Sequence, residues 1–596
     1  MGATQSSCSS NTALSSDPDT TNDSTVATQD DVPAPPKSSS QITLLSQHHH
    51  EPYKAPTSPI HPLAHYIFLV HGWLGNDLEM GYLSESFAKC IAKEGGDTTA
   101  IDGEEEGHDS KRMKRSNSQL LAADAAGEST YPHHPPVVVH SVKCNVGKTH
   151  DGIKNGGTRL AREIVDFIQS DLQKLQSSNA ASSASSEKEG HVTYSIVGNS
   201  LGGLYARYAI SLVPRQLCIP RPIKNNTNND ATSYHSSQQK IHIHPNTFLT
   251  TATPHLGVSQ HTYLPLPRIA ETIIGSGMGV TGTDLFRLNS DKTGRENVIG
   301  AGVRKLSGAR GVLGPWRSNP NTSSNDENNA DSSENSTEEV DQEMECIIRN
   351  MCLQERYLGP LRNFQRRIAY ANAYRTDFQV PTETAAFLNA DSNVVHTVVA
   401  CRDVNVEEGK RDRDENHVPP FVVAVVTTEQ QPPNPDKVEP SASETTTPNE
   451  ELLQMSQSLD ALGWTKFFID VRNRIPLPGI PKPSWRLLPF PSVLSTMLPE
   501  PDTPLDDLIH SRGFKRNSTE ASAERPDSTK QDGVTTLTSS ELIQSTNAGQ
   551  TVHFPMGHTV MVANSKSDAY TKLNFQGRPV MDKLAEDMLR DVLKFE

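Results

Sequence analysis

Cysteines are few and scattered in this sequence, and long apolar runs are missing. The seven cysteines are odd in number and include no C-x2-C pair of the kind that binds zinc. They therefore predict free thiols in an intracellular protein. No run of about 18 apolar residues occurs, and no basic segment followed by an apolar stretch opens the chain. We expect neither a membrane-spanning helix nor a secretory signal.

Positive charge is also scarce. Lys and Arg number 55 against 71 Asp and Glu, which gives a formal net charge of -16. Because affinity for nucleic acid is built mostly from Lys and Arg that neutralise phosphates, this balance argues against a nucleic-acid partner. Hydrophobic residues make up only 34% of the chain. That share is low for a globular protein and predicts an ordered domain diluted by polar tracts.

Polar, low-complexity composition divides the chain into a tail and an interrupted domain. Residues 1–60 are rich in Ser, Thr, Asp, Pro and His, a composition that buries too little surface to offset its ordering entropy. We interpret 61–596 as one domain that carries low-complexity loop insertions. These insertions fall near 95–133, 176–190, 221–240, 317–342, 404–417, 428–450 and 513–550.

The first residues fit a lipidation pattern. The segment 1–6 (MGATQS) matches M-G-x-x-x-[ST], which makes Gly2 a candidate for N-myristoylation, and Cys8 is placed for a palmitoyl thioester. One myristoyl chain binds a membrane only marginally, so a stable anchor needs both groups. We expect a cytoplasmic protein with peripheral attachment to a membrane or lipid droplet. The alternative is an unmodified tail, because so short a pattern also arises by chance.

Apolar periodicity alternates between strand and helix along the domain. Strand-like runs occur at 66–70, 137–140, 193–197, 247–251, 367–373, 396–401, 419–427 and 464–471. Helical spacing occurs at 81–93, 158–174, 201–213 and 580–594. Alternation of this kind is typical of an α/β fold, and we expect a mostly parallel sheet with helices on both faces.

A strand, a G-x-S-x-G pattern and a helix follow one another around Ser200. The strand runs into Gly198-Asn199-Ser200-Leu201-Gly202, and a helical pattern starts directly afterwards. Small flanking residues let a strand turn sharply into a helix, so that the central serine projects from a tight elbow. In this context Ser200 is a candidate nucleophile. The alternative is a structural turn with an idle serine.

The loop after the first strand offers a site for an oxyanion. In 71–75 (HGWLG), Gly72 and Gly75 allow the backbone to bend toward a substrate. We expect the backbone N–H groups of Trp73 and Leu201 to stabilise the oxyanion, since one donor normally follows the nucleophile and the other comes from an earlier loop. His71 is expected to shape the loop.

An acid and a base are expected after the nucleophile, in that order. Asp377 follows the strand-like run 367–373, at a position where α/β sites assemble. Its rival is Asp403, which leads into an acidic tract. Near the end of the chain His558 and His553 are both candidate bases, expected on a flexible loop before the final helical segment. We favour His558 because it lies nearer the apolar run 560–562.

No cofactor or metal is expected. The segment 146–149 (VGKT) imitates the end of a phosphate-binding loop, but Val142 stands where that motif requires glycine.

Several blocks of the chain resemble the lipase-like serine esterase family of the α/β-hydrolase superfamily, which includes yeast and plant lipid-turnover lipases. The blocks are HGWLG at 71–75, 145–160, the elbow, 252–257 (ATPHLG) and 364–374 (FQRRIAYANAY). The resemblance implies Ser200 as nucleophile, Asp377 as orienting acid and His558 as base. Asn199 stands where relatives often have histidine.

The expected activity is hydrolysis of lipid acyl esters, of the monoacylglycerol or phospholipid kind, through an acyl-enzyme. Apolar segments at 258–282 and 475–498 suit a lid or an interfacial surface, although ordinary packing over the sheet explains them equally well. Two alternatives remain open. One is an acyl-protein thioesterase, and the other is a non-catalytic adaptor that uses the hydrolase fold to bind partners.

Overall fold

The computed structural model describes residues 60, 62–94, 135–178, 189–220, 238–259, 268–288, 346–377, 379–401, 419, 421–432, 447–471, 535–547 and 557–593. All of them lie in the unit Tyr53–Glu596. The lipidation candidates Gly2 and Cys8, the rival site residues Asp403 and His553, and the apolar segment 475–498 fall outside the described residues.

Ten strands in the described ranges form one mixed sheet, in the order β10-β7-β8-β9-β6-β5-β3-β1-β2, with β4 paired to β5. The central pairings from β2 to β9 are parallel, and the pairings of β4, β7, β8 and β10 are antiparallel. The strands are β1 (His65–Val70), β2 (Val137–Ser141), β3 (Glu189–Asn199), β4 (Gln216–Pro220), β5 (Gln238–Thr251), β6 (Arg366–Asn372), β7 (Val395–Cys401), β8 (Val422–Thr427), β9 (Thr465–Ile469) and β10 (Thr536–Thr538). The expected α/β fold is therefore present, with an antiparallel edge that the sequence pattern did not predict.

The strand order reverses between β1 and β3. From β1 the chain moves outward to β2, then crosses back so that β3 pairs with the other side of β1. Loops that leave two such strands at their carboxyl ends diverge, and the crevice between them is where ligands bind in open α/β sheets. The 71–75 loop follows β1, and Ser200 follows β3.

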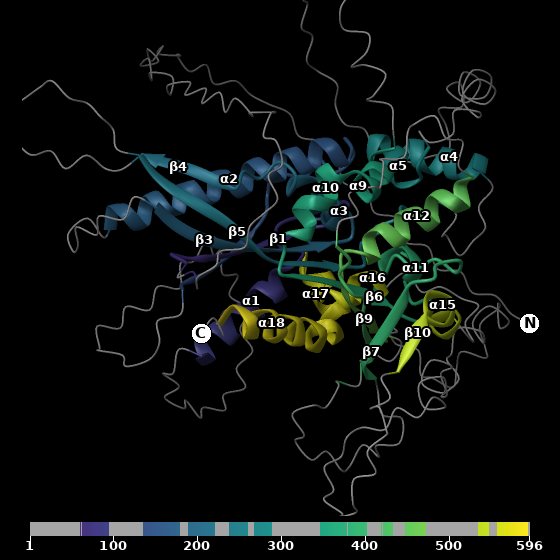
Figure 1. Cartoon of the computed structure of the whole chain (residues 1–596). Coiled ribbons are helices and arrows are strands. Elements are labelled where there is room, and N and C mark those ends of the chain that lie inside the picture. Colours follow the sequence, from purple (N-terminus) through teal and green to yellow (C-terminus); the bar gives the residue numbers. More distant parts are fainter. Residues whose placement is uncertain are drawn as a thin grey trace, which may run out of the picture. The chain divides into compact units, whose positions relative to one another are not determined.

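Helices cover both faces of the sheet (Figure 1). One face carries α2 (Ile153–Ser178), α3 (Leu201–Ala209), α4 (Arg268–Gly277), α5 (Gly279–Leu285), α9 (Ile347–Leu353), α10 (Glu355–Arg362) and α12 (Pro448–Asp460). The other carries α1 (Gly81–Glu94), α16 (Gly557–Met561), α17 (Asp568–Asn574), η4 (Phe575–Gly577) and α18 (Arg578–Leu593). The short helices α11 (Thr382–Ala385) and α15 (Ser539–Asn547) lie near the antiparallel edge.

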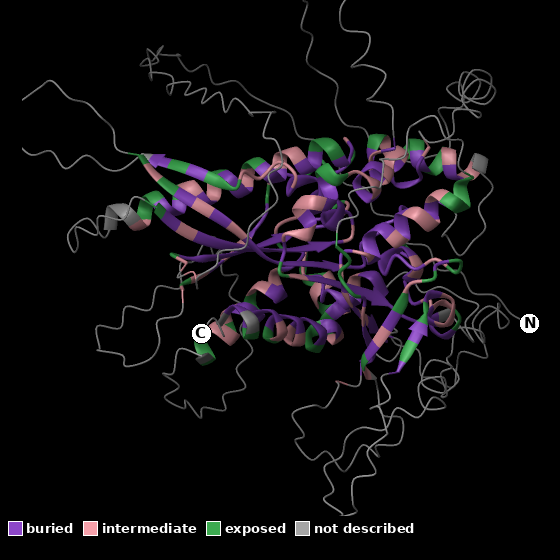
Figure 2. Cartoon of the chain, viewed as in Figure 1, coloured by how far each residue is buried: buried purple, intermediate pink, exposed green. Residues whose placement is uncertain are grey.

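Side-chain alternation in the strands builds two cores, one per face. In β1, Tyr66 and Phe68 belong to the cluster with α2 and α3, whereas Ile67 and Leu69 belong to the cluster with α1 and α18. Successive strand residues point to opposite faces, so a strand covered on both sides is apolar throughout. Figure 2 shows the resulting continuous buried layer along the sheet.

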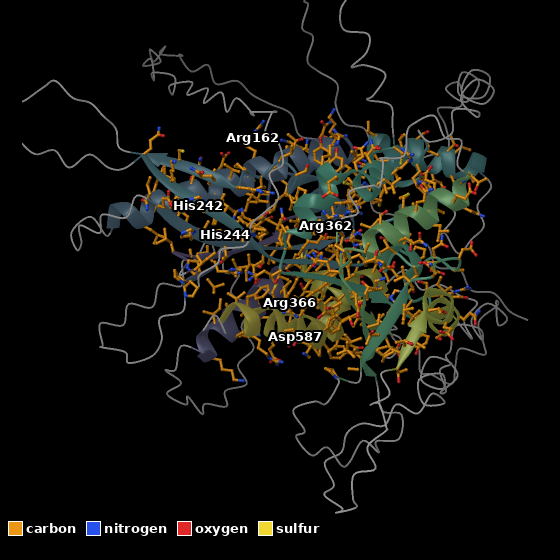
Figure 3. The ribbon with its side chains drawn as sticks, in the orientation of Figure 1. Arg162, His242, His244, Arg362, Arg366 and Asp587 are labelled. Carbon is orange, nitrogen blue, oxygen red and sulfur yellow. The ribbon has the colours of Figure 1, made fainter. Side chains whose placement is uncertain are left out.

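The final helix docks onto the sheet by its apolar side and by its backbone. Val580, Leu584 and Met588 are buried. At the start of β6, Arg366 donates from Nη1 to the Asp587 carbonyl oxygen at 3.3 Å, and the two residues lie close together in Figure 3. α18 also contacts α1, so the two ends of the domain in sequence meet on one face.

One predicted insertion is partly wrong. The tract 513–550 contains β10 and α15, and β10 pairs antiparallel with β7. Its polar composition hid the element because only Leu537 of the Thr-Leu-Thr strand is buried, as expected of an edge strand. The predicted tract 428–450 likewise ends inside a helix, since α12 begins at Pro448 behind a Thr447 capping box.

Close packing of α2 on α3 predicts a stability effect at Gly156. A Cβ at this position would collide with the Tyr205 ring, and one at Gly157 would lie 2.6 Å from Tyr208 Cδ1. Gly156→Ala should therefore lower the free energy of unfolding by ~1–3 kcal/mol despite the higher helix propensity of alanine. Urea titration measures it. Gly277→Ala, where a Cβ meets nothing within 4 Å, is the matched control. Equal stability of the two variants would contradict the packing.

Candidate active site

Ser200 occupies a strained turn between β3 and α3. Its backbone has φ 54° and ψ -125°, a conformation that costs a non-glycine residue ~1–3 kcal/mol and persists only where its surroundings enforce it. The Ser200 N–H donates to the Thr251 carbonyl oxygen at 2.8 Å. A Cβ on Gly198 would lie 2.5 Å from Gly203 Cα, so no larger residue fits inside the elbow. The sequence pattern at 198–203 thus forms the sharp turn that it predicts.

The 71–75 loop lies directly against this elbow. A Cβ on Gly72 would stand 3.0 Å from Ser200 Cβ, and one on Gly202 would collide with the Val70 carbonyl oxygen. Gly75 donates its N–H to the Gly72 carbonyl oxygen at 3.1 Å, and Leu74 takes φ 55° to close the turn. The two loops predicted to share a site therefore meet at backbone contact.

Two backbone donors beside Ser200 are unused. Gly72 N–H donates to Glu79 Oε1 at 2.8 Å, and Leu74 N–H donates to Thr149 Oγ1 at 3.2 Å. Among the described residues, the N–H groups of Trp73 and Leu201 have no acceptor. Leu201 opens α3, where helix geometry leaves the first N–H groups unpaired. These two donors are the ones that the sequence suggested for an oxyanion.

Asp377 and His558 form a buried pair. His558 Nδ1 lies 2.8 Å from Asp377 Oδ2, although 181 positions separate the two residues in sequence. Asp377 Oδ1 accepts the N–H groups of Gln379 and Val380, both at 2.9 Å, and Oδ2 also accepts from Asn372 Nδ2 at 3.1 Å. The carboxylate is only 1% exposed and has every oxygen satisfied, so it holds the imidazole in one orientation.

The position of His558 differs from the expectation in one respect. It was predicted on a flexible loop, but it lies in the first turn of α16. The preceding Gly557 packs against the Thr376 backbone so tightly that a Cβ there would collide with the carbonyl oxygen. A short helix fixed on the loop that carries Asp377 places the ring more firmly than a free loop would.

The environment of His558 favours its protonated form. Burial lowers the pKa of the imidazole, but the carboxylates of Asp377 and, more weakly, Glu79 outweigh it and raise the pKa above its ordinary value of 6.5. Such a base readily accepts a proton from a nucleophile. Among the described residues, Ser200 Oγ makes no hydrogen bond to His558. In unliganded active sites this contact is often long and tightens only with substrate.

Sequence reasoning missed two polar residues at this site. Glu79 is buried beside the oxyanion loop, and Asn199 donates to it from Nδ2 at 2.7 Å. The available signal was an acid between the apolar Leu78 and Met80 just before a helix. His71, expected to shape the loop, is buried with Nδ1 3.0 Å from the Gly72 carbonyl oxygen.

A second group of histidines lies elsewhere. His191 on β3 is 3.0 Å from His244 on β5, and His242 is 5.2 Å from His191 between ring centroids. Ser200 lies nine positions after His191, which corresponds to ~30 Å along an extended strand, so this group is not part of the site. Figure 3 shows His242 and His244 on the part of β5 near β4. Within the described ranges, no group of three or more His, Cys, Asp or Glu is arranged to hold a metal ion.

Comparison with known proteins agrees with the geometry. The chain matches the family described as Putative serine esterase (DUF676) over residues 62–390, more than half of its 596 residues. The chain belongs to this family. No curated protein and no solved structure matches the chain.

The match to the serine esterase family spans the oxyanion loop, the elbow and Asp377, and it ends before His558. The candidate base therefore depends on the structure rather than on the family match. Of the residues predicted for the site, Ser200, Trp73 and Leu201 lie together, and Asp377 and His558 are hydrogen-bonded. Family membership supports a serine hydrolase activity in general terms.

The hydrogen-bonded pair of Asp377 and His558 predicts how the pKa of His558 responds to mutation. Removal of the charge in Asp377→Asn should lower the pKa of His558, because burial then dominates. Histidine Cε1–H resonances followed by NMR against pH measure this, with His558→Asn to assign the signal. Since the folded-state pKa is raised above 6.5, the pair stabilises the fold fully at lower pH and loses that effect as pH rises through the folded value. An unchanged pKa in Asp377→Asn would contradict the pairing.

Proposed function

We propose that this serine esterase hydrolyses acyl esters of lipids, of the monoacylglycerol or phospholipid kind, through an acyl-enzyme on Ser200. The observation that carries the proposal concerns the contact between the 71–75 loop and the strained serine. The N–H groups of Trp73, on that loop, and of Leu201, next to the serine, have no acceptor among the described residues. Peptide N–H groups beside a reactive serine need an acceptor, and a developing oxyanion supplies one.

In the proposed mechanism, Ser200 Oγ attacks the ester carbonyl carbon while His558 Nε2 takes the hydroxyl proton. The carbonyl π electrons move to the oxygen, which accepts hydrogen bonds from Trp73 and Leu201. Collapse of this intermediate breaks the bond to the alcohol, and His558 returns the proton to that leaving oxygen. Water then attacks the acyl-enzyme with the same base, releasing the fatty acid and restoring Ser200.

Exposed apolar residues next to the oxyanion loop support a lipid substrate. Leu74, Ile273 and Val280 are 54%, 57% and 56% exposed. The segments of Leu74 and Val280 are joined at Thr149, whose Oγ1 accepts from Leu74 N–H and whose carbonyl oxygen accepts from Thr281 Oγ1 at 2.8 Å. Ile273 lies on α4, which packs against α5. Apolar side chains in water beside an acyl site suit contact with acyl chains or a lipid surface. α4 and most of α5 lie within 258–282, the segment whose composition suits a lid or an interfacial surface.

The proposed lipid substrate calls for a way to hold the chain at a lipid surface. None of the helices in the described ranges is long and apolar enough to span a bilayer. We propose that acyl groups on Gly2 and Cys8 bring the chain to its substrate at a membrane or lipid droplet, since two weak anchors together give stable binding.

Covalent labelling tests the nucleophile. A fluorophosphonate probe should label the purified protein at one serine, and Ser200→Ala should abolish the label, because only an activated serine displaces fluoride from this probe. Intact-protein mass spectrometry measures the adduct. Absence of a label, or a label that survives Ser200→Ala, would refute the esterase and leave a non-catalytic adaptor as the interpretation.

Replacement of the exposed apolar residues tests the lipid substrate. The double variant Ile273→Ser, Val280→Ser should hydrolyse phospholipid vesicles or monoacylglycerol emulsions ~10-fold more slowly, because two aliphatic side chains no longer enter the lipid surface. Its rate on a soluble short-chain ester should stay the same. Val399→Ser, at an equally exposed valine on β7, is the control. Preference for an acyl-protein thioester over both lipids would establish the thioesterase alternative instead.

A further inference from the structure

Glu79 connects the two loops of the candidate site with a single oxygen atom. Its side chain is buried, and Oε1 accepts the Gly72 N–H at 2.8 Å and Asn199 Nδ2 at 2.7 Å. Gly72 immediately precedes the oxyanion donor Trp73, and Asn199 immediately precedes Ser200. The carboxylate therefore fixes both neighbours of the reacting groups relative to each other.

The same segment is attached to the turn after α16. The Glu79 carbonyl oxygen accepts the Ser565 N–H at 3.1 Å, and Ser565 Oγ donates to the Leu78 carbonyl oxygen at 2.7 Å. Tyr82 N–H in turn donates to Ser565 Oγ at 3.3 Å. α16 carries His558, so the Glu79 segment is hydrogen-bonded to the oxyanion loop, to the elbow and to the turn that follows the helix of the candidate base.

Glycines make room for this carboxylate. A Cβ on Gly75 would collide with Glu79 Oε2, and one on Gly72 would lie 3.4 Å from Oε1. The 71–75 loop thus wraps around the acid as well as approaching the substrate. Gly75 is therefore needed for two reasons. Any side chain there would collide with Glu79, and its N–H closes the turn by donating to the Gly72 carbonyl oxygen.

The charge of Glu79 has no permanent partner among the described residues, because no Lys or Arg there lies within ion-pair distance of it. A buried carboxylate without a cation is costly, although its two hydrogen bonds lessen that cost. The Glu79 backbone is hydrogen-bonded to Ser565 in the turn after α16, the helix that carries His558, and the Glu79 charge favours the protonated form of that histidine.

Several charged groups on α18, which packs on the same face as α16, are engaged with other partners. On α18, Arg578 lies over the Tyr82 ring, Asp582 accepts from the Tyr82 hydroxyl, and Lys583 pairs with Asp587. The charges that act on His558 are those of Asp377 and Glu79.

We propose that Glu79 is a positioning residue with two effects, one on the Trp73 donor through Gly72 and one on His558 through its charge. The carboxylate holds the oxyanion loop in place before substrate arrives, and it joins Asp377 in stabilising the imidazolium that forms when Ser200 gives up its proton. This inference rests on the proposed esterase function of the site.

Two substitutions separate these effects. Glu79→Gln keeps an oxygen that accepts from Gly72 and Asn199 but removes the charge. It should lower the NMR pKa of His558 and move the acidic limb of the kcat/KM profile to lower pH by the same amount, with kcat for a soluble ester reduced ~10-fold. Glu79→Ala removes both effects and should lower kcat ~10²–10³-fold with little change in KM, as loss of an oxyanion donor does. The exposed Glu85 on α1 supplies the control, Glu85→Gln, which should change none of these quantities.

The outcomes are distinct from those for the esterase itself. An unchanged His558 pKa in folded Glu79→Gln would overturn the charge effect, and this titration is independent of turnover. Fluorophosphonate labelling of Glu79→Ala at the wild-type rate, with near-ultraviolet circular dichroism showing a native fold, would overturn the positioning effect. If Glu79→Ala does not fold, the Glu79→Gln titration and rate profile still decide the proposal. Failure of wild-type labelling at Ser200 would instead refute the proposed esterase.

Discussion

The contact between Gly202 and the end of β1 is the constraint on which the rest of the site depends. There is no space for a side chain between the first turn of α3 and the Val70 carbonyl oxygen. Parallel neighbouring strands bring their carboxyl ends to the same edge, but only glycine lets the backbones that leave them touch. That contact brings the loop that carries Trp73 against the turn that carries Ser200 and Leu201, so the candidate oxyanion donors are placed by the backbone rather than by side chains.

Much of this arrangement was predictable because it depends on local sequence. The elbow, the 71–75 loop and the central strands carry short-range signals, namely glycines at fixed spacing and apolar runs beside them. The antiparallel edge was not predictable in the same way. β10 has one buried side chain, and its pairing with β7 is set by a contact far away in sequence. The position of His558 on a helix had no local signal either, because Gly557 is explained only by the Thr376 backbone it packs against.

The site contains a second buried carboxylate, Glu79, that residue patterns in the sequence do not reveal. A sequence-based search for a catalytic acid looks for one carboxylate after a strand, and Asp377 meets that description. Glu79 does not, since it precedes a helix and lies on the other side of the elbow. In the sequence, Asn199 stood out only as a residue at a position where similar proteins often have histidine. Its hydrogen bond to Glu79 gives it a structural partner, because the amide donates to the acid while Oδ1 accepts from Thr251.

The sequence separation of Asp377 and His558 has a consequence for how the protein is made. The elbow and the 71–75 loop need the chain only as far as β5, where Thr251 accepts the Ser200 N–H, yet the candidate base His558 comes far later, 181 positions beyond Asp377. During translation the chain would therefore carry a shaped but unactivated nucleophile. A chain assembled in this order acquires the Asp377–His558 pair, and any activity that depends on it, only when α16 docks against the finished sheet.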